Sequence, residues 1–234
     1  MNGEARRAPR PEPDLTPAAR AALEPLVEML GREGSAPSSA AAASSAWTVH
    51  VADSLSGLGF AELARAATIA DVGSGAGFPG LVLAAMLPEA RVDLIESTGR
   101  KCEFIERAAS AGGIVNARVV NRRAEEWAAG EGREAYDAVT ARAVGRLSTL
   151  AELASPLLRP GGVLVAWKGR RDPEEEAELG RAAPRLAMEP REIRWVGPYA
   201  GSENRHLHLL AKAGDTPAEL PRRPGMAKKR PRGA

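Results

Sequence analysis

The sequence of 234 residues has little sulfur and few aromatic side chains. Cys102 is its single cysteine, so the chain forms no internal disulfide, and we expect it to work in a reducing compartment, the cytoplasm. With one cysteine and three histidines it also offers too few ligands for a structural zinc site. Aromatic residues make up 4% of the chain against 44% for all hydrophobic residues, so the core must consist mainly of Ala, Val and Leu.

Long apolar runs are absent as well. No stretch approaches the roughly 18 apolar residues that span a membrane. The N-terminus lacks the apolar segment of a signal peptide. At this length we expect one α/β domain with extensions, and no membrane partner.

Charge is unevenly distributed along the chain. The formal net charge is +2, yet residues 222–234 carry six basic residues and no acidic one. Without them, 26 basic residues stand against 30 acidic ones, so the basic character belongs to the tail. Such a tail favours contact with nucleic acid, and a solvated, disordered end is the alternative that composition alone leaves open.

The order of elements predicts a Rossmann-like α/β fold with a mostly parallel sheet, because short apolar strands alternate with helices. Strands are expected at 67–72, 91–96, 117–121, 136–141 and 162–167. Helices are expected at 79–87, 99–111, 147–158 and 173–183. Residues 191–196 and 206–212 have the pattern of strands with no long helix between them, so we expect a terminal antiparallel hairpin.

The N-terminal part is expected to be helical. Residues 1–13 hold three prolines and mixed charge, which is typical of disorder. A helix is predicted at 15–32, with Thr16 as its N-cap and Pro17 in its first position. The Ser/Ala-rich residues 35–46 are either a linker or a loose helix, and a short helix at 49–58 leads into the first strand.

The most informative stretch is residues 71–80, D-V-G-S-G-A-G-F-P-G, which joins a predicted strand to a helix. Its glycines let the backbone turn tightly and bring N–H groups up to a ligand. Gly73, Gly75 and Gly77 alternate, and Phe78 takes the place of the third glycine of a dinucleotide fingerprint. The form acid-x-G-x-G-x-G is typical of enzymes that use S-adenosylmethionine (SAM). A tight turn without a ligand is the alternative.

The ends of the other strands supply further candidates, because ligands of parallel sheets bind at the carboxyl ends of the strands. Glu96 ends the second strand about 20 residues beyond the turn, where an acid binds ribose hydroxyls. Ala124 and Glu125, beyond the third strand, would flank the adenine. Arg142 and Lys168 follow the fourth and fifth strands and suit an anionic or electron-rich substrate. A surface charge or a carboxylate partner is the alternative for each cation.

The sequence lacks the residues that several common types of enzyme require. No phosphate-loop lysine follows the glycines, and Ser74 has no G-x-S-x-G context, so neither ATP hydrolysis nor a serine hydrolase is expected. Cys102 lies inside a predicted helix and is expected to pack rather than to act as a nucleophile. The Pro-Cys and Pro-Pro-Tyr steps of cytosine-C5 and amino-group nucleic-acid methylases do not follow the fourth strand.

Further steps accompany the glycine turn in a fixed order. They are H-V-A-D-S-L at 50–55, E-S-T-G-R-K at 96–101, R-A-E-E at 123–126, T-A-R-A at 140–143, A-W-K-G at 166–169, R-H-L at 205–207 and T-P…P-R-R-P-G…K at 216–229. Together they resemble the bacterial 16S rRNA guanine-N7 methyltransferases, also called glucose-inhibited division protein B. The resemblance covers about residues 47–231.

The resemblance implies methyl transfer from SAM to N7 of a guanine in 16S rRNA. It implies 16S rRNA, the small ribosomal subunit or an assembly intermediate as partner, and no metal. Carried over by position, the cofactor-binding residues are Gly73, Gly75, Gly77, Phe78, Glu96, Ala124, Glu125 and Arg142. Arg142 would lie beside the methyl donor and the substrate, and Lys168 would be a second catalytic candidate on the substrate side.

This sequence departs from the family in two places. The N-L-T step that usually precedes H-x-x-D-S-L is missing, which puts the substrate contact of that region in question, and Glu96 stands where the family mostly has aspartate. Two other functions stay open: a SAM-dependent methylase of a small molecule, and a non-catalytic SAM- or nucleotide-binding regulator.

The expected organisation has four parts. They are a disordered N-terminus at 1–13, a helical region at 14–65, the SAM-binding methyltransferase domain at 66–213 and the basic tail at 214–234. Because the predicted adenosine site lies in loops at the sheet edge, the tail is expected to take no part in SAM binding.

Overall fold

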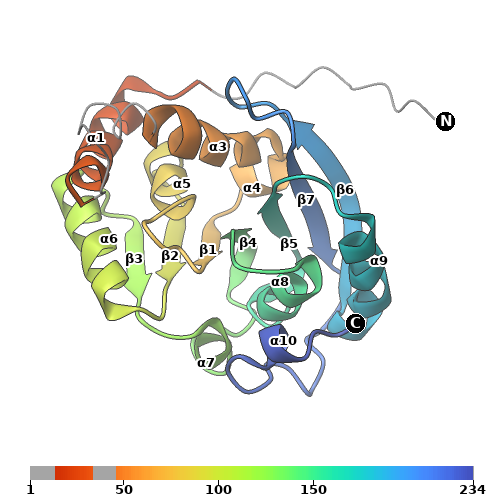
Figure 1. Cartoon of the computed structure of the whole chain (residues 1–234). Helices are drawn as coiled ribbons and strands as arrows, with labels where there is room; N and C mark the ends of the chain where they lie inside the picture. Colours follow the sequence, from red (N-terminus) through yellow and green to blue (C-terminus); the bar gives the residue numbers. More distant parts are fainter. Residues whose placement is uncertain (1–13, 34–45, 234) are drawn as a thin grey trace.

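A seven-stranded sheet forms the centre of the protein, in the order β3-β2-β1-β4-β5-β7-β6 (Figure 1). The computed structural model describes residues 14–33 and 46–233. The strands are β1 (Thr68–Val72), β2 (Arg91–Ile95), β3 (Ala117–Val120), β4 (Tyr136–Arg142), β5 (Leu158–Lys168), β6 (Met188–Val196) and β7 (Arg205–Lys212). The first five pair in parallel, and β7 is antiparallel to both β5 and β6. The predicted Rossmann-like sheet with a terminal hairpin is therefore confirmed.

Helices cover both faces of the sheet (Figure 1). One face carries α1 (Pro17–Glu33), the π-helical η1 (Ala46–Val51), α3 (Ala52–Leu55), the 3-10 helix η2 (Ser56–Gly59), α4 (Ala61–Ala64), α5 (Gly80–Met86) and α6 (Gly99–Ala111). The other carries α7 (Ala124–Ala128), α8 (Leu147–Ala154), α9 (Pro173–Ala182), the 3-10 helix η3 (Ala183–Leu186) and, against α8, α10 (Met226–Lys229). Among the described residues, no helix is both long and apolar enough to cross a membrane.

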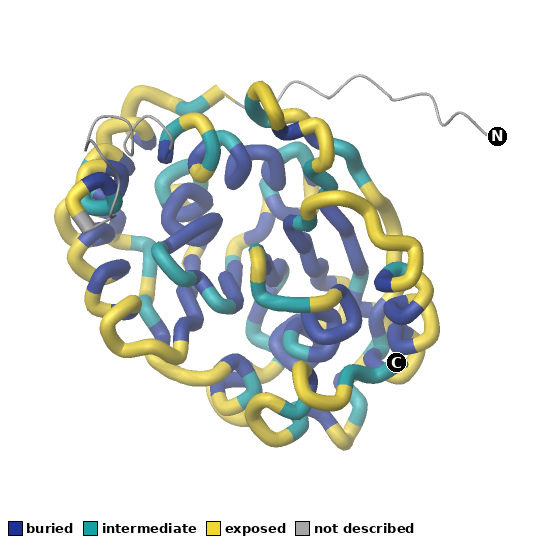
Figure 2. Tube along the Cα trace, in the orientation of Figure 1, coloured by how far each residue is buried: buried dark blue, intermediate teal, exposed yellow. Residues whose placement is uncertain are grey.

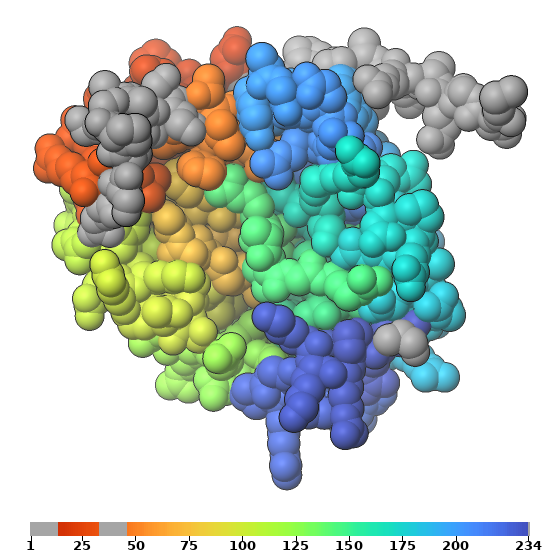
Figure 3. Space-filling view, in the orientation of Figure 1, coloured from red at the N-terminus to blue at the C-terminus, as the bar shows by residue number. Residues whose placement is uncertain are grey.

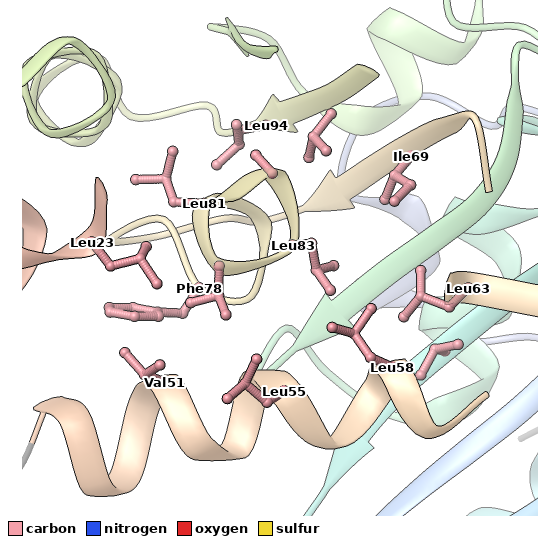
Figure 4. Packing of buried hydrophobic residues seen from close by; sticks show 14 of the residues in the cluster. Leu23, Val51, Leu55, Leu58, Leu63, Ile69, Phe78, Leu81, Leu83 and Leu94 are labelled. Atoms are coloured by element: carbon pink, nitrogen blue, oxygen red, sulfur yellow. The ribbon is translucent and has the colours of Figure 1, made fainter. Parts of the chain in front are cut away.

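Two apolar clusters hold these layers together, and the sheet between them is buried (Figure 2). Figure 4 shows the first cluster, where Leu23 of α1, Val51 of η1 and Leu81 of α5 converge on Phe78. Most members of both clusters are Ala, Val, Leu or Ile, as the composition predicts. The core therefore places Phe78, which directly follows the glycine turn, at the junction of the N-terminal helices and the sheet.

The N-terminal helix begins as expected. Thr16 caps α1, because its Oγ1 accepts a hydrogen bond from the N–H of Ala19 (3.1 Å), and Pro17 is the first helical residue. A Cβ at Gly112 would lie 2.0 Å from the carbonyl oxygen of Ala22, so α1 packs directly on the end of α6. The expectations for residues 1–13 and for the Ser/Ala-rich stretch up to residue 45 lie outside the described residues.

The largest errors in element boundaries occur where the backbone is irregular. Helix α8 ends at Ala154 rather than near 158, because Pro156 has no N–H to continue it. Strand β5 begins at Leu158 rather than 162, and its pairing with β4 shifts register near Tyr136. Helices α7 and α10 are too short for a periodic pattern, and neither was predicted.

Candidate cofactor and substrate site

The glycine turn has the backbone that its sequence predicts. Gly73, Gly75 and Gly77 have φ values of +69°, +59° and +94°, which side-chain-bearing residues rarely adopt. A Cβ would lie 2.7 Å from Val144 at Gly73 and 2.7 Å from Leu81 at Gly77. At Gly75 the nearest atom is 3.8 Å away, so this glycine borders open space. Close packing requires the first and third glycines, whereas the second leaves room for a ligand.

Asp71 stabilises the glycine turn through hydrogen bonds to its buried carboxylate. Its carboxylate is fully buried and accepts hydrogen bonds from the N–H of Gly80 (3.1 Å) and from Oγ1 of Thr140 (2.9 Å). Burial raises the pKa of the Asp71 carboxyl above its ordinary value. The acid that opens the acid-x-G-x-G-x-G pattern thus shapes the loop, and it does not face a ligand.

Glu96 connects the end of β2 to the same turn. Its Oε2 accepts from the N–H of Gly75 (3.1 Å) and its Oε1 accepts from the N–H of Thr98 (2.9 Å). Lys101 Nζ lies 4.0 Å from Oε2. Since each carboxylate oxygen has more than one acceptor position, Glu96 can still accept hydrogen bonds from a ligand hydroxyl.

A pocket of about 220 Å³ opens at the carboxyl ends of β1, β2 and β3. Four residues singled out from the sequence lie in its wall: Gly73, Glu96, Ala124 and Glu125. The other wall includes Gly225, Ala227 and Lys228 from the C-terminal segment, which we define as residues 214–233. Figure 3 shows this blue segment bordering the hollow in that face of the molecule. No local pattern predicts this second wall, although Gly225 belongs to the T-P…P-R-R-P-G…K step at 216–229.

Phe78 and Arg142 form a second group near the turn. The Arg142 guanidinium lies 5.3 Å from the centre of the Phe78 ring, and its Nη1 lies 3.2 Å from Oδ2 of Asp53. The His50 ring is tilted against Phe78 with 5.2 Å between ring centres. Arg205 Nε lies 3.9 Å from Oδ1 of the same Asp53, which is buried.

His50, Asp53 and Arg205 were not singled out as site residues, although two quoted steps of the family pattern contain them. Burial first, and then the charge of Arg142, lowers the pKa of His50 below its ordinary value. At neutral pH the imidazole beside Phe78 is therefore uncharged. The H-x-x-D-S-L step thus lies against the carboxyl end of β4, about 90 residues later in the chain.

Lys168 fastens the loop that follows β4. Its Nζ donates to the carbonyl oxygen of Gly145 (2.9 Å) and to Oε1 of Glu175 (2.6 Å). The same oxygen of Glu175 accepts from the N–H of Leu147 (2.6 Å). Lys168 therefore has the carboxylate partner that was the alternative to a catalytic role, and its contact with a substrate stays a prediction.

Val144 connects the pocket with the group formed by Phe78 and Arg142. This residue lines the pocket and lies against Gly73, and it is two positions beyond Arg142. Gly75, Gly77, Phe78, Arg142 and Lys168 do not line the pocket itself. Among the residues that the structure describes, no three His, Cys, Asp or Glu side chains are grouped to hold a metal ion.

The chain is similar to known proteins in sequence. The family model described as rRNA small subunit methyltransferase G matches residues 28–203. A protein named ribosomal RNA small subunit methyltransferase G from Rubrobacter xylanophilus is 44% identical over 187 residues, covering 78% of this chain and 71% of that one. Its namesake from Deinococcus deserti is 40% identical over 184 residues, covering 78% and 75%.

Solved structures show the fold. One described as a mutant of MtNAS has a TM-score of 0.56 at 12% identity, covering 84% of this chain and 71% of that one. The Methanococcus jannaschii fibrillarin pre-rRNA processing protein has a TM-score of 0.51 at 16% identity, covering 64% and 67%. At these identities the likeness concerns the architecture alone.

Proposed function

The chain belongs to the rRNA small subunit methyltransferase G family, and from that premise we propose that it transfers the methyl group of SAM to N7 of a guanine in 16S rRNA. The observation that carries the proposal is the match of the family model over residues 28–203. It is supported by a pocket at the strand ends whose wall contains Gly73, Glu96, Ala124 and Glu125.

The pocket suits the adenosyl part of SAM. Glu96 is placed to accept hydrogen bonds from the ribose hydroxyls, and the small, buried Ala124 leaves room for the flat face of the adenine. Gly75, where a Cβ would meet only the carbonyl oxygen of Gly73 at 3.8 Å, leaves room for the methionine part. When bound, SAM supplies a methyl group on a positively charged sulfur.

The chemistry at guanine needs positioning more than proton transfer. Guanine N7 carries a free lone pair, so no general base is required. Asp53 and the Phe78 ring hold the Arg142 guanidinium in place. We assign Arg142 the role of donating to O6 of the guanine, which orients N7 toward the methyl group.

RNA binding would draw on the outer face of the C-terminal segment. Four of its cations are exposed and have no carboxylate within ion-pair distance among the described residues: Arg223, Lys228, Lys229 and Arg230. Arg222 and Arg232 instead pair with Glu152 and belong to the fold. Phosphate contacts would therefore involve four cations rather than six. The target guanine must leave its stack in an RNA loop to reach the donor. We infer that the reaction takes place in the cytoplasm.

The test maps N7-methylguanine in 16S rRNA from cells with and without this gene. We expect one N7-methylguanine to disappear with the gene and to return with the parent sequence, but not with the Gly75→Val variant. Unchanged 16S rRNA methylation overturns the proposal. In that case, activity of the purified protein on free metabolites indicates a small-molecule methylase, and tight SAM binding without turnover indicates a regulator.

A further inference from the structure

The C-terminal segment returns across α8 (Figure 1), and three of its residues line the pocket. Arg222 donates through Nε and Nη2 to the two carboxylate oxygens of Glu152 on α8, a geometry that gives strong, oriented hydrogen bonds. Thr149 Oγ1 donates to the carbonyl oxygen of Ala227 (3.2 Å). Leu220 and Ala227 are each 2% exposed. The segment is thus a docked part of the fold, which contradicts the solvated, disordered end that composition left open.

Docking brings the segment into contact with a predicted adenine-binding residue. The N–H of Gly225 donates to Oε1 of Glu125 at 2.7 Å, although the two residues are 100 positions apart. Gly225 has a φ of +81°, a backbone conformation that favours glycine. Oε2 of Glu125 has no hydrogen-bond partner among the described residues. This leaves one carboxylate oxygen fixed and one free beside the pocket.

We propose that the C-terminal segment forms a wall of the cofactor pocket, and that Gly225 is a positioning residue that orients Glu125 toward the exocyclic amino group of the adenine. The proposal rests on the proposed function, because the ligand class is the adenosyl group of SAM. Gly225, Ala227 and Lys228 line the pocket together with Gly73 and Glu96. The expectation that the tail takes no part in SAM binding is therefore replaced by a direct contribution to the site.

The direct test displaces the segment in the full chain. Ala227→Glu places a charged, larger side chain where a buried alanine packs on α8, so the wall opens and Glu125 loses its partner. Lys229→Gln is the matched control, because it changes the net charge by the same amount at an exposed position that does not line the pocket. Isothermal titration should show the dissociation constant for SAM rising about tenfold or more in Ala227→Glu, as loss of a hydrogen bond to a charged group implies. Lys229→Gln should bind SAM as tightly as the parent does, because its expected effect is on RNA binding alone.

A second measurement uses the parent chain and needs no variant to fold. Lys228 and Lys229 are exposed trypsin sites within the segment. A ligand that binds only the docked state lowers the population of the undocked one. Saturating S-adenosylhomocysteine should therefore slow cleavage there, and cleavage after Arg32 in α1 should be unaffected.

The outcomes separate the two proposals. An equal SAM affinity in Ala227→Glu and the parent overturns the wall, and it leaves the methyltransferase proposal standing. An unchanged trypsin cleavage rate at Lys228 and Lys229 with S-adenosylhomocysteine present also overturns the wall. A parent chain that binds no SAM at all overturns the proposed function together with the wall.

Discussion

The two walls of the pocket are built in opposite ways. On the sheet side, short loops follow neighbouring strands and are held by contacts close in sequence: the N–H of Gly75 reaches Glu96 across 21 positions, and Thr98 reaches it across two. The C-terminal wall depends on contacts across 100 positions to Glu125 and 70 to Glu152. The glycine turn and Glu96 thus belong to one β1-α5-β2 unit, although Thr140 and Val144 also support the turn, whereas the second wall depends on contacts between the C-terminal segment and residues 70 to 100 positions earlier.

The largest effect is expected on the sheet side. Gly75→Val should lower SAM affinity by roughly a hundredfold or more, because the branched side chain enters the ligand's space and opposes a positive φ. Gly113→Val is the control: Gly113 also has a positive φ, +65°, with nothing within 4 Å of a Cβ, and it lies outside the pocket. Titration with SAM checks both. Equal affinities in the two folded variants would contradict the assignment of the turn.

Next in size is the substrate side. Arg142→Ala should lower the single-turnover rate of methyl transfer to 16S rRNA about a hundredfold through lost orientation of the guanine. SAM affinity should change much less, because the contact assigned to Arg142 is with O6 of the guanine. Arg146→Ala, at the far end of the same loop, is the control. A large drop in melting temperature with normal specific activity would give Arg142 a structural role instead.

A smaller loss is expected for Glu96→Ala. Removing the acceptor of the ribose hydroxyls should cost on the order of 1.5–3 kcal/mol, or roughly tenfold to a hundredfold in SAM affinity. Glu103→Ala, at an exposed position on α6, should bind SAM as the parent does. An unchanged affinity in Glu96→Ala would show that the carboxylate serves only Gly75 and Thr98.

The smallest effect is expected on the exposed face of the C-terminal segment, which is predicted to bind RNA and not SAM. Lys229→Gln should weaken RNA binding a few-fold and reduce the slope of log K against log salt by about 0.7, the value for one phosphate contact on a single strand. SAM affinity should stay unchanged. Nitrocellulose filter binding at several salt concentrations measures the slope. A slope equal to that of the parent would remove Lys229 from the RNA surface.

The contrast between the walls also explains what could be predicted. The succession of strands and helices along the chain, the glycine turn and the position of Glu96 follow from patterns within a few residues, namely apolar alternation and glycine spacing. The pairing of Arg222 with Glu152 leaves no such pattern. A run of basic residues predicts a solvated or an RNA-binding segment. No feature of the neighbouring sequence distinguishes Arg222, which pairs with Glu152 of α8, from the exposed Arg223.

The same reasoning holds for the substrate side. Arg142 was identified from its place after the fourth strand, but its partner Asp53 comes from a helix before the sheet, and only tertiary packing brings them together. Lys168 had an equivalent place after the fifth strand. Its partner Glu175 follows seven residues later, and this close carboxylate distinguishes a loop-fastening lysine from a free one.

A crystal structure of the full chain with S-adenosylhomocysteine tests the account most directly. The adenine should lie between Ala124 and Ala227, with its amino group on Oε2 of Glu125, the ribose on Glu96 and the N–H of Gly225 still donating to Oε1 of Glu125. An adenosyl group bound elsewhere, or bound at Glu96 with the C-terminal segment away from the pocket, would contradict the two-walled site.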